Sequence, residues 1–283
     1  MRRIIAIALS VLMVAGLFVG CGQESDGSFQ PVAAGKLTVA TSPDFAPMEF
    51  VDATKDGQDK YVGFDVTLAK YIAEGLGLEL VITPMSFDAC QTAVAMGTVD
   101  MALSGFSWTE ERAENYNLSD YYRAGDNEDE QILITLAGNE GLYDTAEKLA
   151  GLKVGAQTAS LQESLCQDQL ADSELVIVSD LTTALMQLRN GDFVALAVAK
   201  GNGQAMAANN ADIIESGFYF DVDEKYTGYV IMMRKGNDEL TAKVNELLAE
   251  SKDLWEQWYI DAKSIAGIEV IYDDEGNEVG TVE

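Results

Sequence analysis

Short apolar runs alternate with amphipathic runs along most of this chain, and this alternation constrains the fold more than any other feature. Between residues 36 and 105, β-branched runs such as "KLTVATS" and "LELVITPM" flank "VGFDVTLAKYIAEGLG", in which apolar residues recur at helical spacing. The same order of strands and helices returns between residues 150 and 199. This repeated order favours largely parallel sheets covered by helices, which predicts an α/β fold.

The chain carries two such α/β units, which suggests two lobes that face each other across a cleft. Its 283 residues, 48% of them hydrophobic, can bury the cores that two lobes need. The segment over residues 238–260 has an apolar stripe at helical spacing, which we predict to pack on a core. The stripe consists of Leu240, Val244, Leu247, Leu248, Leu254 and Trp258.

The first twenty residues have two arginines before an apolar run, which is the pattern of an export signal. The run ends in Gly20 and Cys21, which resembles the lipobox of bacterial lipoproteins, although Phe18 stands where that pattern usually has leucine. We predict a lipoprotein signal peptide over residues 1–20, lipidation of Cys21, and a flexible tether over residues 21–35. A retained transmembrane anchor is the alternative, and either one places the rest of the chain outside the cytoplasm.

The mature chain is strongly acidic and lacks histidine. Without residues 1–20 it has 16 Lys and Arg against 47 Asp and Glu, a net charge of about −31, which disfavours nucleic acid and anionic membrane surfaces as partners. The absence of histidine removes the usual triads and the imidazole metal ligand, so we expect no catalytic site, no metal and no cofactor. Cys90 and Cys166 are too few for a disulfide framework, and we predict two buried thiols.

One arginine follows a strand-like run at the place where open α/β sheets bind their ligands. The segment "SGFSWTEER" begins directly after the strand-like run "VDMAL" over residues 99–103, and ligands of such sheets lie beyond the carboxyl ends of the strands. Gly105 permits close backbone approach, Ser107 offers a hydroxyl, and Arg112 offers a guanidinium fork suited to a carboxylate. The spacing equally allows Arg112 to pair with neighbouring glutamates on a solvated helix face, and both interpretations stay open here.

Five blocks of the sequence resemble one family of binding proteins. They are "VATSPDFAPMEF", "VGFDVTLAKYIAEGLG", "VDMALSGFSWTEERAENYNLSDYY", "LKVGAQTASLQE" and "VIMMRKGNDELTAKVNELL". The resemblance is to the bacterial extracellular solute-binding protein family 3, the polar amino-acid binding proteins of ABC importers. It implies a two-lobed periplasmic-binding-protein fold of type II, in which each lobe is a sheet flanked by helices and the chain crosses the hinge twice.

The resemblance also implies the domain bounds. Lobe 1 would comprise residues 36–123 and 220–260, and lobe 2 would comprise residues 124–219. Residues 261–283 would form a C-terminal tail, for which the polar sequence predicts a hairpin with its turn near residues 275–277.

Eight residues match ligand-binding positions of the family. Phe45 and Phe87 correspond to aromatic residues on two sides of the ligand, and a role in the core is the alternative for both. A carboxylate-binding segment falls in lobe 1, and the start of a helix in lobe 2 would add donors, because helix N-termini favour anions. The set implied by the resemblance is Phe45, Phe87, Ser104, Gly105, Ser107, Arg112, Ser160 and Gln162.

The sequence departs from the family at the position that usually pairs with the α-ammonium of the ligand. An aspartate is usual there, and this chain has Ala199. A buried ammonium without a partner is unfavourable, so either another carboxylate, Asp44 or Glu163, takes this role, or the ligand is not a standard α-amino acid. Ser42 stands where some members that bind basic amino acids have an aspartate, which disfavours arginine and lysine as ligands.

Taken with the resemblance, the sequence predicts a binding protein and not an enzyme. We expect a monomeric extracytoplasmic lipoprotein, anchored to the cell membrane, that captures a small carboxylate-bearing solute by hinge closure. It would deliver the solute to an ABC permease, whose ATPase drives transport. Two alternatives stay open: an enzyme similar to cyclohexadienyl dehydratases on the same fold, with Glu163 as general acid, and a ligand-sensing protein. The identities of the solute and of the permease also stay open.

Overall fold

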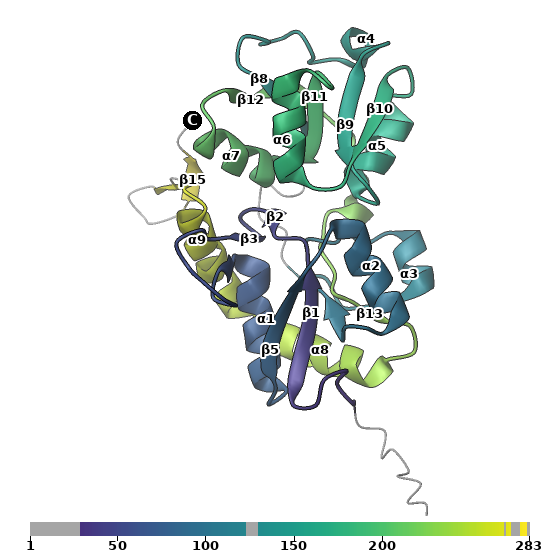
Figure 1. Ribbon diagram of the computed structural model, residues 1–283, viewed down its shortest axis with the longest axis vertical. Helices are drawn as coiled ribbons and strands as arrows, with labels where there is room; N and C mark the ends of the chain where they lie inside the picture. Colours follow the sequence, from purple (N-terminus) through teal and green to yellow (C-terminus); the bar gives the residue numbers. More distant parts are fainter. Residues whose placement is uncertain (1–28, 123–129, 269, 273–277, 282–283) are drawn as a thin grey trace, which may run out of the picture.

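The computed structural model describes residues 29–122, 130–268, 270–272 and 278–281. The chain forms two five-stranded sheets, each flanked by helices and placed one above the other in Figure 1. The predicted α/β fold with a sheet in each lobe is confirmed. The predicted signal peptide, Cys21 and the predicted turn near residues 275–277 lie outside the described residues.

The first sheet has the strand order β5–β1–β6–β13–β7. Its strands are β1 (Lys36–Thr41), β5 (Glu79–Pro84), β6 (Met101–Ala102), β7 (Tyr116–Leu118) and β13 (Met232–Arg234). β1 is parallel to its two neighbours β5 and β6, whereas β13 is antiparallel to β6 and β7. Since β13 comes late in the chain, the chain leaves this sheet after β7 and returns to it after building the second sheet.

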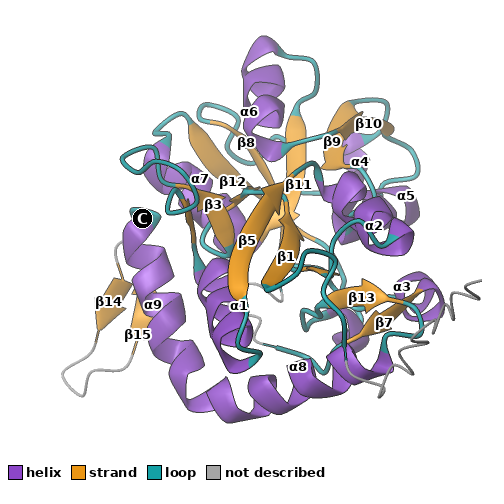
Figure 2. Ribbon diagram, turned by 60° about the horizontal axis from the view of Figure 1, so that its bottom comes forward, coloured by secondary structure: helices purple, strands orange, loops and turns teal. Residues whose placement is uncertain are grey.

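Helices and a small antiparallel sheet flank the first sheet, and we call this assembly lobe 1. The helices are α1 (Phe64–Gly75), α2 (Phe87–Met96), α3 (Glu110–Asn115), α8 (Asp238–Ser251) and α9 (Trp255–Ile265). The small sheet consists of β2 (Asp44–Phe45), β3 (Glu49–Val51) and β4 (Tyr61–Val62). Figure 2 shows α8 continuing into α9 through the short 3₁₀ turn η2 (Lys252–Leu254).

The second sheet has the order β10–β9–β11–β8–β12, and with its helices it forms lobe 2. Its strands are β8 (Gln131–Leu136), β9 (Lys153–Gln157), β10 (Glu174–Val178), β11 (Ala195–Ala199) and β12 (Ile213–Tyr219). Its helices are α4 (Ala146–Leu149), α5 (Leu161–Gln169), α6 (Leu181–Asn190) and α7 (Lys200–Asn209). β9 is parallel to β10 and β11, and β8 is antiparallel to β11 and β12. A 3₁₀ turn, η1 (Glu224–Tyr226), lies on the return path to β13.

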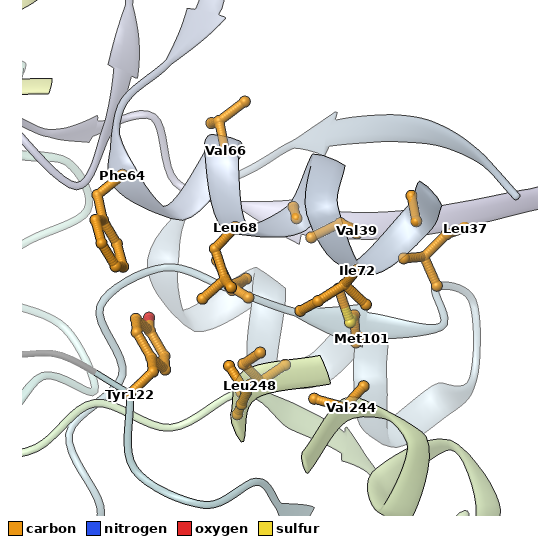
Figure 3. Packing of buried hydrophobic residues seen from close by; sticks show 14 of the residues in the cluster. Leu37, Val39, Phe64, Val66, Leu68, Ile72, Met101, Tyr122, Val244 and Leu248 are labelled. Atoms are coloured by element: carbon orange, nitrogen blue, oxygen red, sulfur yellow. The ribbon is translucent and has the colours of Figure 1, made fainter. Parts of the chain in front are cut away.

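Each lobe has its own apolar core. In lobe 1, Figure 3 shows Phe64 at the start of α1 beside Tyr122, with Val244 and Leu248 of α8 packed below α1. The predicted apolar stripe of residues 238–260 therefore packs on the core, with one exception: Leu254 lies in η2 and is exposed. Cys90 and Cys166 are free, buried thiols, as predicted.

Both ends of the described chain contact the folded body. Within the predicted tether, Phe29 packs against the core of lobe 1, and the backbone N–H of Val32 donates to Asp100 Oδ1 at 2.7 Å. At the other end α9 runs past residue 260, and Asn209 Nδ2 of α7 donates to the carbonyl of Ala266 at 2.8 Å. The strands β14 (Val270–Tyr272) and β15 (Glu278–Thr281) then pair antiparallel. Among the described residues, the structure has no helix with the length and apolar character to cross a membrane.

Candidate ligand-binding site

A small cavity lies between the two lobes. All eight residues implied by the family resemblance line it. Five further residues also line it, namely Asp44, Gln131, Gln157, Leu161 and Tyr229. The cavity therefore brings together the ends of β9 and β6, the start of α5 and the segment around β2.

Arg112 is buried at this cavity, with 5% of its surface exposed. It lies on the short helix α3, where Thr109 caps the helix by accepting from the Arg112 backbone N–H at 3.1 Å. Its guanidinium donates from Nη1 to the carbonyl of Ser107 at 2.6 Å and from Nη2 to the carbonyl of Ala159, in lobe 2, at 2.8 Å. The alternative of a solvated pair with neighbouring glutamates is wrong, because the side chain is buried.

Two aromatic rings line the inner side of this guanidinium. The Arg112 Cζ lies 5.6 Å from the ring centre of Phe87 and 5.3 Å from that of Phe106, and the two rings stack 4.5 Å apart. Burial lowers the pKa of Arg112 to about 10, so it is still charged at neutral pH. Phe87 thus contributes both to the cavity wall and to the core of lobe 1.

Phe45 also lines the cavity, and Gly105 makes room for its ring. Gly105 has φ +55°, and a Cβ at this position would lie 2.7 Å from Cε1 of Phe45. The ring of Phe45 also meets that of Tyr229 edge to face, with their centres 6.3 Å apart. We predicted that Gly105 would allow another group to come close to its backbone, and in the structure the ring of Phe45 occupies this place.

Polar groups of Ser104 and Gly105 are bonded to two buried carboxyls behind the cavity wall. Ser104 Oγ donates to Glu49 Oε1 at 2.5 Å and accepts from the backbone N–H of Ser42 at 3.0 Å. The backbone N–H of Gly105 donates to Asp65 Oδ2 at 2.9 Å. The Ser104 hydroxyl and the Gly105 N–H, which we predicted to contact the ligand, therefore donate to carboxyl groups of the protein in this arrangement.

The carboxyls of Glu49 and Asp65 form a buried pair that sequence reasoning did not identify. Both are almost fully enclosed, and the Tyr122 hydroxyl donates to Asp65 Oδ2 at 2.9 Å. Burial, together with the Asp65 charge, raises the pKa of Glu49 well above its usual range, and burial raises the pKa of Asp65 to about 6. We therefore expect Glu49 to hold its proton at neutral pH.

The lobe 2 wall is built at the start of α5. Ser160 caps this helix: its Oγ accepts from the Glu163 N–H at 3.1 Å and donates to the carbonyl of Gln157 at 2.6 Å. Its hydroxyl proton is thus used within lobe 2. Gln162 Nε2 donates to Gln131 Oε1 at 2.5 Å, which places two carboxamides together on this wall.

Asp44 is the carboxylate that the cavity presents from lobe 1. Its Oδ1 accepts from Ser42 Oγ at 2.8 Å. Its Oδ2 accepts from the backbone N–H of Leu181, the first residue of α6, at 2.7 Å and from Gln157 Nε2 at 3.3 Å. Burial raises the pKa of Asp44. The other carboxylate considered from the sequence, Glu163, is not among the described residues that line the cavity.

The described part of the chain contains no group of three or more Cys, Asp or Glu side chains arranged to hold a metal ion. Lys200, which follows Ala199, pairs with Glu130 and lies over the ring of Tyr219, away from the cavity lining. Arg112 and Asp44 are therefore the charged groups that the described residues place at the cavity.

A two-lobed α/β structure with a polar and aromatic cavity between its lobes is the architecture of a solute-binding protein of type II. The model of the bacterial extracellular solute-binding proteins, family 3, matches residues 37–258, and the chain belongs to this family. The predicted family and fold class are confirmed.

Individual relatives include binding proteins and an enzyme. The chain is 30% identical to the arginine-binding extracellular protein ArtP of Bacillus subtilis, covering 82% of this chain and 86% of that protein. The solved structure of an amino acid ABC transporter substrate-binding protein, AbpA from Streptococcus pneumoniae bound to L-arginine, has a TM-score of 0.74 and 32% identity, covering 82% of this chain and 96% of the other. A cyclohexadienyl dehydratase of Pseudomonas aeruginosa is 30% identical over 161 residues, which is 56% of this chain and 57% of the enzyme.

Proposed function

We propose that this protein is the extracytoplasmic binding component of an ABC importer and that it captures a small solute bearing a carboxylate. The observation that carries the proposal is the buried guanidinium of Arg112, which faces the interlobe cavity and has only uncharged hydrogen-bond partners among the described residues. A ligand carboxylate would supply the missing negative charge and accept the fork of N–H groups. The relatives named for amino-acid binding support an amino acid or a similar compound.

The proposed roles of the predicted residues follow from their places on the cavity wall. Arg112 and Ser107 would bind the carboxylate, and the rings of Phe45 and Phe87 would enclose the body of the ligand. Gln162 would add a carboxamide from lobe 2. Ser104, Gly105 and Ser160 would shape the wall at the places where their polar groups are already bonded within the protein.

Capture would proceed by closure of the two lobes around the ligand. The proposed hinge consists of the two crossings, between β7 and β8 and between β12 and β13, so that lobe 1 comprises residues 36–123 and 220–260 and lobe 2 residues 124–219. Bonds from Arg112 to Ala159 and from Asp44 to Leu181 join the lobes at the cavity. A ligand that touches both lobes favours the closed form, because only there are all its contacts made.

Delivery would follow from the location of the protein. We propose that Cys21 is lipidated and holds a monomer at the outer face of the cell membrane, where the closed form docks on a permease. The permease and its ATPase would then carry out transport. Recovery of a permease by crosslinking in membranes would separate this role from that of a ligand-sensing protein.

A thermal-shift screen tests the binding function. The mature protein is heated with each of the standard L-amino acids, small carboxylates and betaines, and a compound that binds only the folded state raises the melting temperature. Arg112→Ala should abolish the shift for every hit. The matched control is Lys200→Ala, whose charge lies outside the cavity lining and which should retain the shift. Normal binding by Arg112→Ala together with loss in Lys200→Ala would overturn the proposal.

A dehydratase activity is a second candidate function, because a relative is named a cyclohexadienyl dehydratase. The candidate acid, Glu163, accepts from the Ala159 N–H at 2.6 Å and from Gln167 Nε2 at 3.2 Å, and it lies at the outer side of the α5 start. This position disfavours a role as general acid in the cavity. Incubation of the protein with prephenate or arogenate tests the candidate, since product formation would establish an enzyme.

A further inference from the structure

Two buried carboxyls behind the cavity wall each have one oxygen without a hydrogen-bond partner. Glu49 of β3 and Asp65 of α1 are 0% and 1% exposed. Glu49 Oε1 accepts from the Ser104 hydroxyl at 2.5 Å. Asp65 Oδ2 accepts from the Gly105 N–H and from the Tyr122 hydroxyl, each at 2.9 Å. Among the described residues, no donor reaches the remaining oxygens, Glu49 Oε2 and Asp65 Oδ1. A buried polar atom without a partner is unfavourable, so the two oxygens require an explanation.

The fold holds these two carboxyls beside each other. The Asp65 backbone N–H donates at 2.8 Å to the carbonyl of Met48, the residue before Glu49. On the other side, the two carboxyls bond to consecutive residues, Ser104 and Gly105. The Glu49 and Asp65 side chains are also within hydrogen-bonding reach of each other. Ionised carboxylates only accept hydrogen bonds and repel each other, so this contact is favourable only if a proton lies between them.

We infer that Glu49 and Asp65 share one proton, which Glu49 Oε2 carries and donates to Asp65 Oδ1, and that Glu49 is thereby a positioning residue for the cavity wall at Ser104 and Gly105. The shared proton gives both remaining oxygens a partner. It also leaves the buried pair with one negative charge instead of two. The effect on ligand binding rests on the proposed function, whereas the shared proton does not.

The surroundings make Asp65 the ionised member of the pair. Asp65 is the second residue of α1, and the N-terminus of a helix favours a negative charge. It accepts from an N–H and a hydroxyl in addition to the shared proton, whereas Glu49 accepts from the Ser104 hydroxyl. The pKa values agree with this order, because burial raises the pKa of Asp65 to about 6 and raises that of Glu49 well above its usual range.

Three other titratable groups face the pair from the elements around it. Asp44 of β2 and Cys90 of α2 lie near Glu49, and Tyr122, which follows β7, donates to Asp65. Burial raises the pKa of Cys90 and of Tyr122, so both are neutral near pH 7. Asp44 adds a negative charge, which further favours the proton on Glu49. None of the three is a cation that could replace the proton.

The pair is connected to the cavity through a short hydrogen-bonded network. Ser104 Oγ donates to Glu49 and accepts from the Ser42 backbone N–H at 3.0 Å. Ser42 Oγ in turn donates to Asp44 Oδ1 at 2.8 Å, and both Ser104 and Asp44 line the cavity. A buried network in which every group has a partner is rigid, and a network with missing partners is not. The proton on Glu49 therefore fixes a part of the wall that the ligand would contact.

Carbon-13 NMR of the side-chain carboxyls tests the shared proton in the ligand-free chain that begins after Cys21. The carboxyl shift of each residue reports its own protonation, and at about pH 7.5 Glu49 should be protonated while Asp65 is ionised. This measurement needs no variant, so it stands even where a substitution impairs folding.

Asp65→Asn should lower the pH at which Glu49 loses its proton by at least about one unit, because it removes the like charge and supplies an N–H donor. The Gly105 N–H resonance of this variant should shift with the same midpoint, which a merely structural side chain would not cause. The control is Glu74→Gln, which replaces an exposed carboxylate on α1 and should leave the Glu49 midpoint unchanged.

A binding comparison tests the positioning role, with the compound of the thermal-shift screen that raises the melting temperature most. Glu49→Leu has neither an acceptor for Ser104 nor a donor for Asp65, and it should bind this compound at least about tenfold more weakly. Glu49→Gln supplies both groups and should restore the affinity to within about twofold of the wild type.

Each part of the inference has results that would overturn it. An ionised Glu49 at about pH 7.5, an unchanged Glu49 midpoint in Asp65→Asn, or a Gly105 resonance that does not follow this midpoint would overturn the shared proton. Wild-type affinity in Glu49→Leu, or an equal loss in Glu49→Gln, would overturn the positioning role. If no compound of the screen binds, the proposed function fails, and the NMR result on the proton still stands.

Discussion

Replacement of Glu49 by glutamine isolates the effect of one buried proton on stability. The Glu49 side chain has 0% exposure, accepts from Ser104 Oγ and lies beside the Asp65 charge. Burial and that charge raise the pKa of Glu49 well above 4.5, its usual value. Glutamine has nearly the same shape and is neutral, so it reproduces the protonated form without needing a proton.

The pH dependence follows from proton linkage. A carboxyl whose pKa is raised by folding binds its proton more tightly in the folded chain, so its contribution to stability is complete below the unfolded pKa. That contribution is lost as the pH rises toward the folded pKa, by about 1.4 kcal/mol for each pH unit. Above about pH 7 the neighbouring Asp65, whose pKa is about 6, has largely ionised. The pH range above about pH 7 therefore reports on Glu49.

The assay is urea unfolding followed by tryptophan fluorescence at several pH values in this interval. The free energy of unfolding of Glu49→Gln minus that of the wild type should rise by about 1.4 kcal/mol per pH unit. Glu74→Gln, an exposed carboxylate on α1, is the control and should give a constant difference. A constant difference for Glu49→Gln as well would refute the reasoning, because Glu49 would then be ionised in the folded protein.

Three further predictions concern the backbone and the thiols. Ala159 has φ +58°, a left-handed conformation that is strained for any residue with a Cβ. Ala159→Gly should therefore raise the free energy of unfolding by about 1 kcal/mol in urea unfolding, and a free energy of unfolding below that of the wild type would contradict this prediction. Gly63 has φ +117°, and a Cβ there would lie 2.2 Å from the Met48 carbonyl oxygen, so Gly63→Ala should destabilise by more than about 3 kcal/mol in the same assay. Both thiols are buried, and burial raises the pKa of Cys166 to about 12 and also raises the pKa of Cys90. In a chain that begins after Cys21, neither thiol should therefore react with a thiol reagent until urea unfolds the protein. Rapid labelling of the native protein would contradict this prediction, because it would show that a thiol is accessible.

The elements with clear periodicity could be predicted from the sequence. β1, α1 and β5 fall within the segments predicted from alternating and helical spacing, because their apolar residues point to one core. The helix α7 was not predicted, since Gly201 and Gly203 weaken its helical propensity and its apolar residues form no clear stripe. The small sheet of β2, β3 and β4 was also missed, because strands of two or three residues give almost no periodic signal.

The cavity could be predicted in part. Gln157 ends β9 at the same edge of the sheet as the α5 start, so the rule that ligands lie beyond strand ends could have found it. Gln131 could not be found in that way, because it begins β8, which runs antiparallel to β11. The bond from Ser104 to Glu49 depends on packing between β6 and β3, and no local pattern indicates it.

A crystal structure with the compound of the screen that raises the melting temperature most would test the central claim most directly. The account predicts that the ligand carboxylate lies within hydrogen-bond distance, about 3 Å, of the Arg112 guanidinium inside the interlobe cavity. A ligand that binds elsewhere, or that turns its carboxylate away from Arg112 toward solvent, would contradict it.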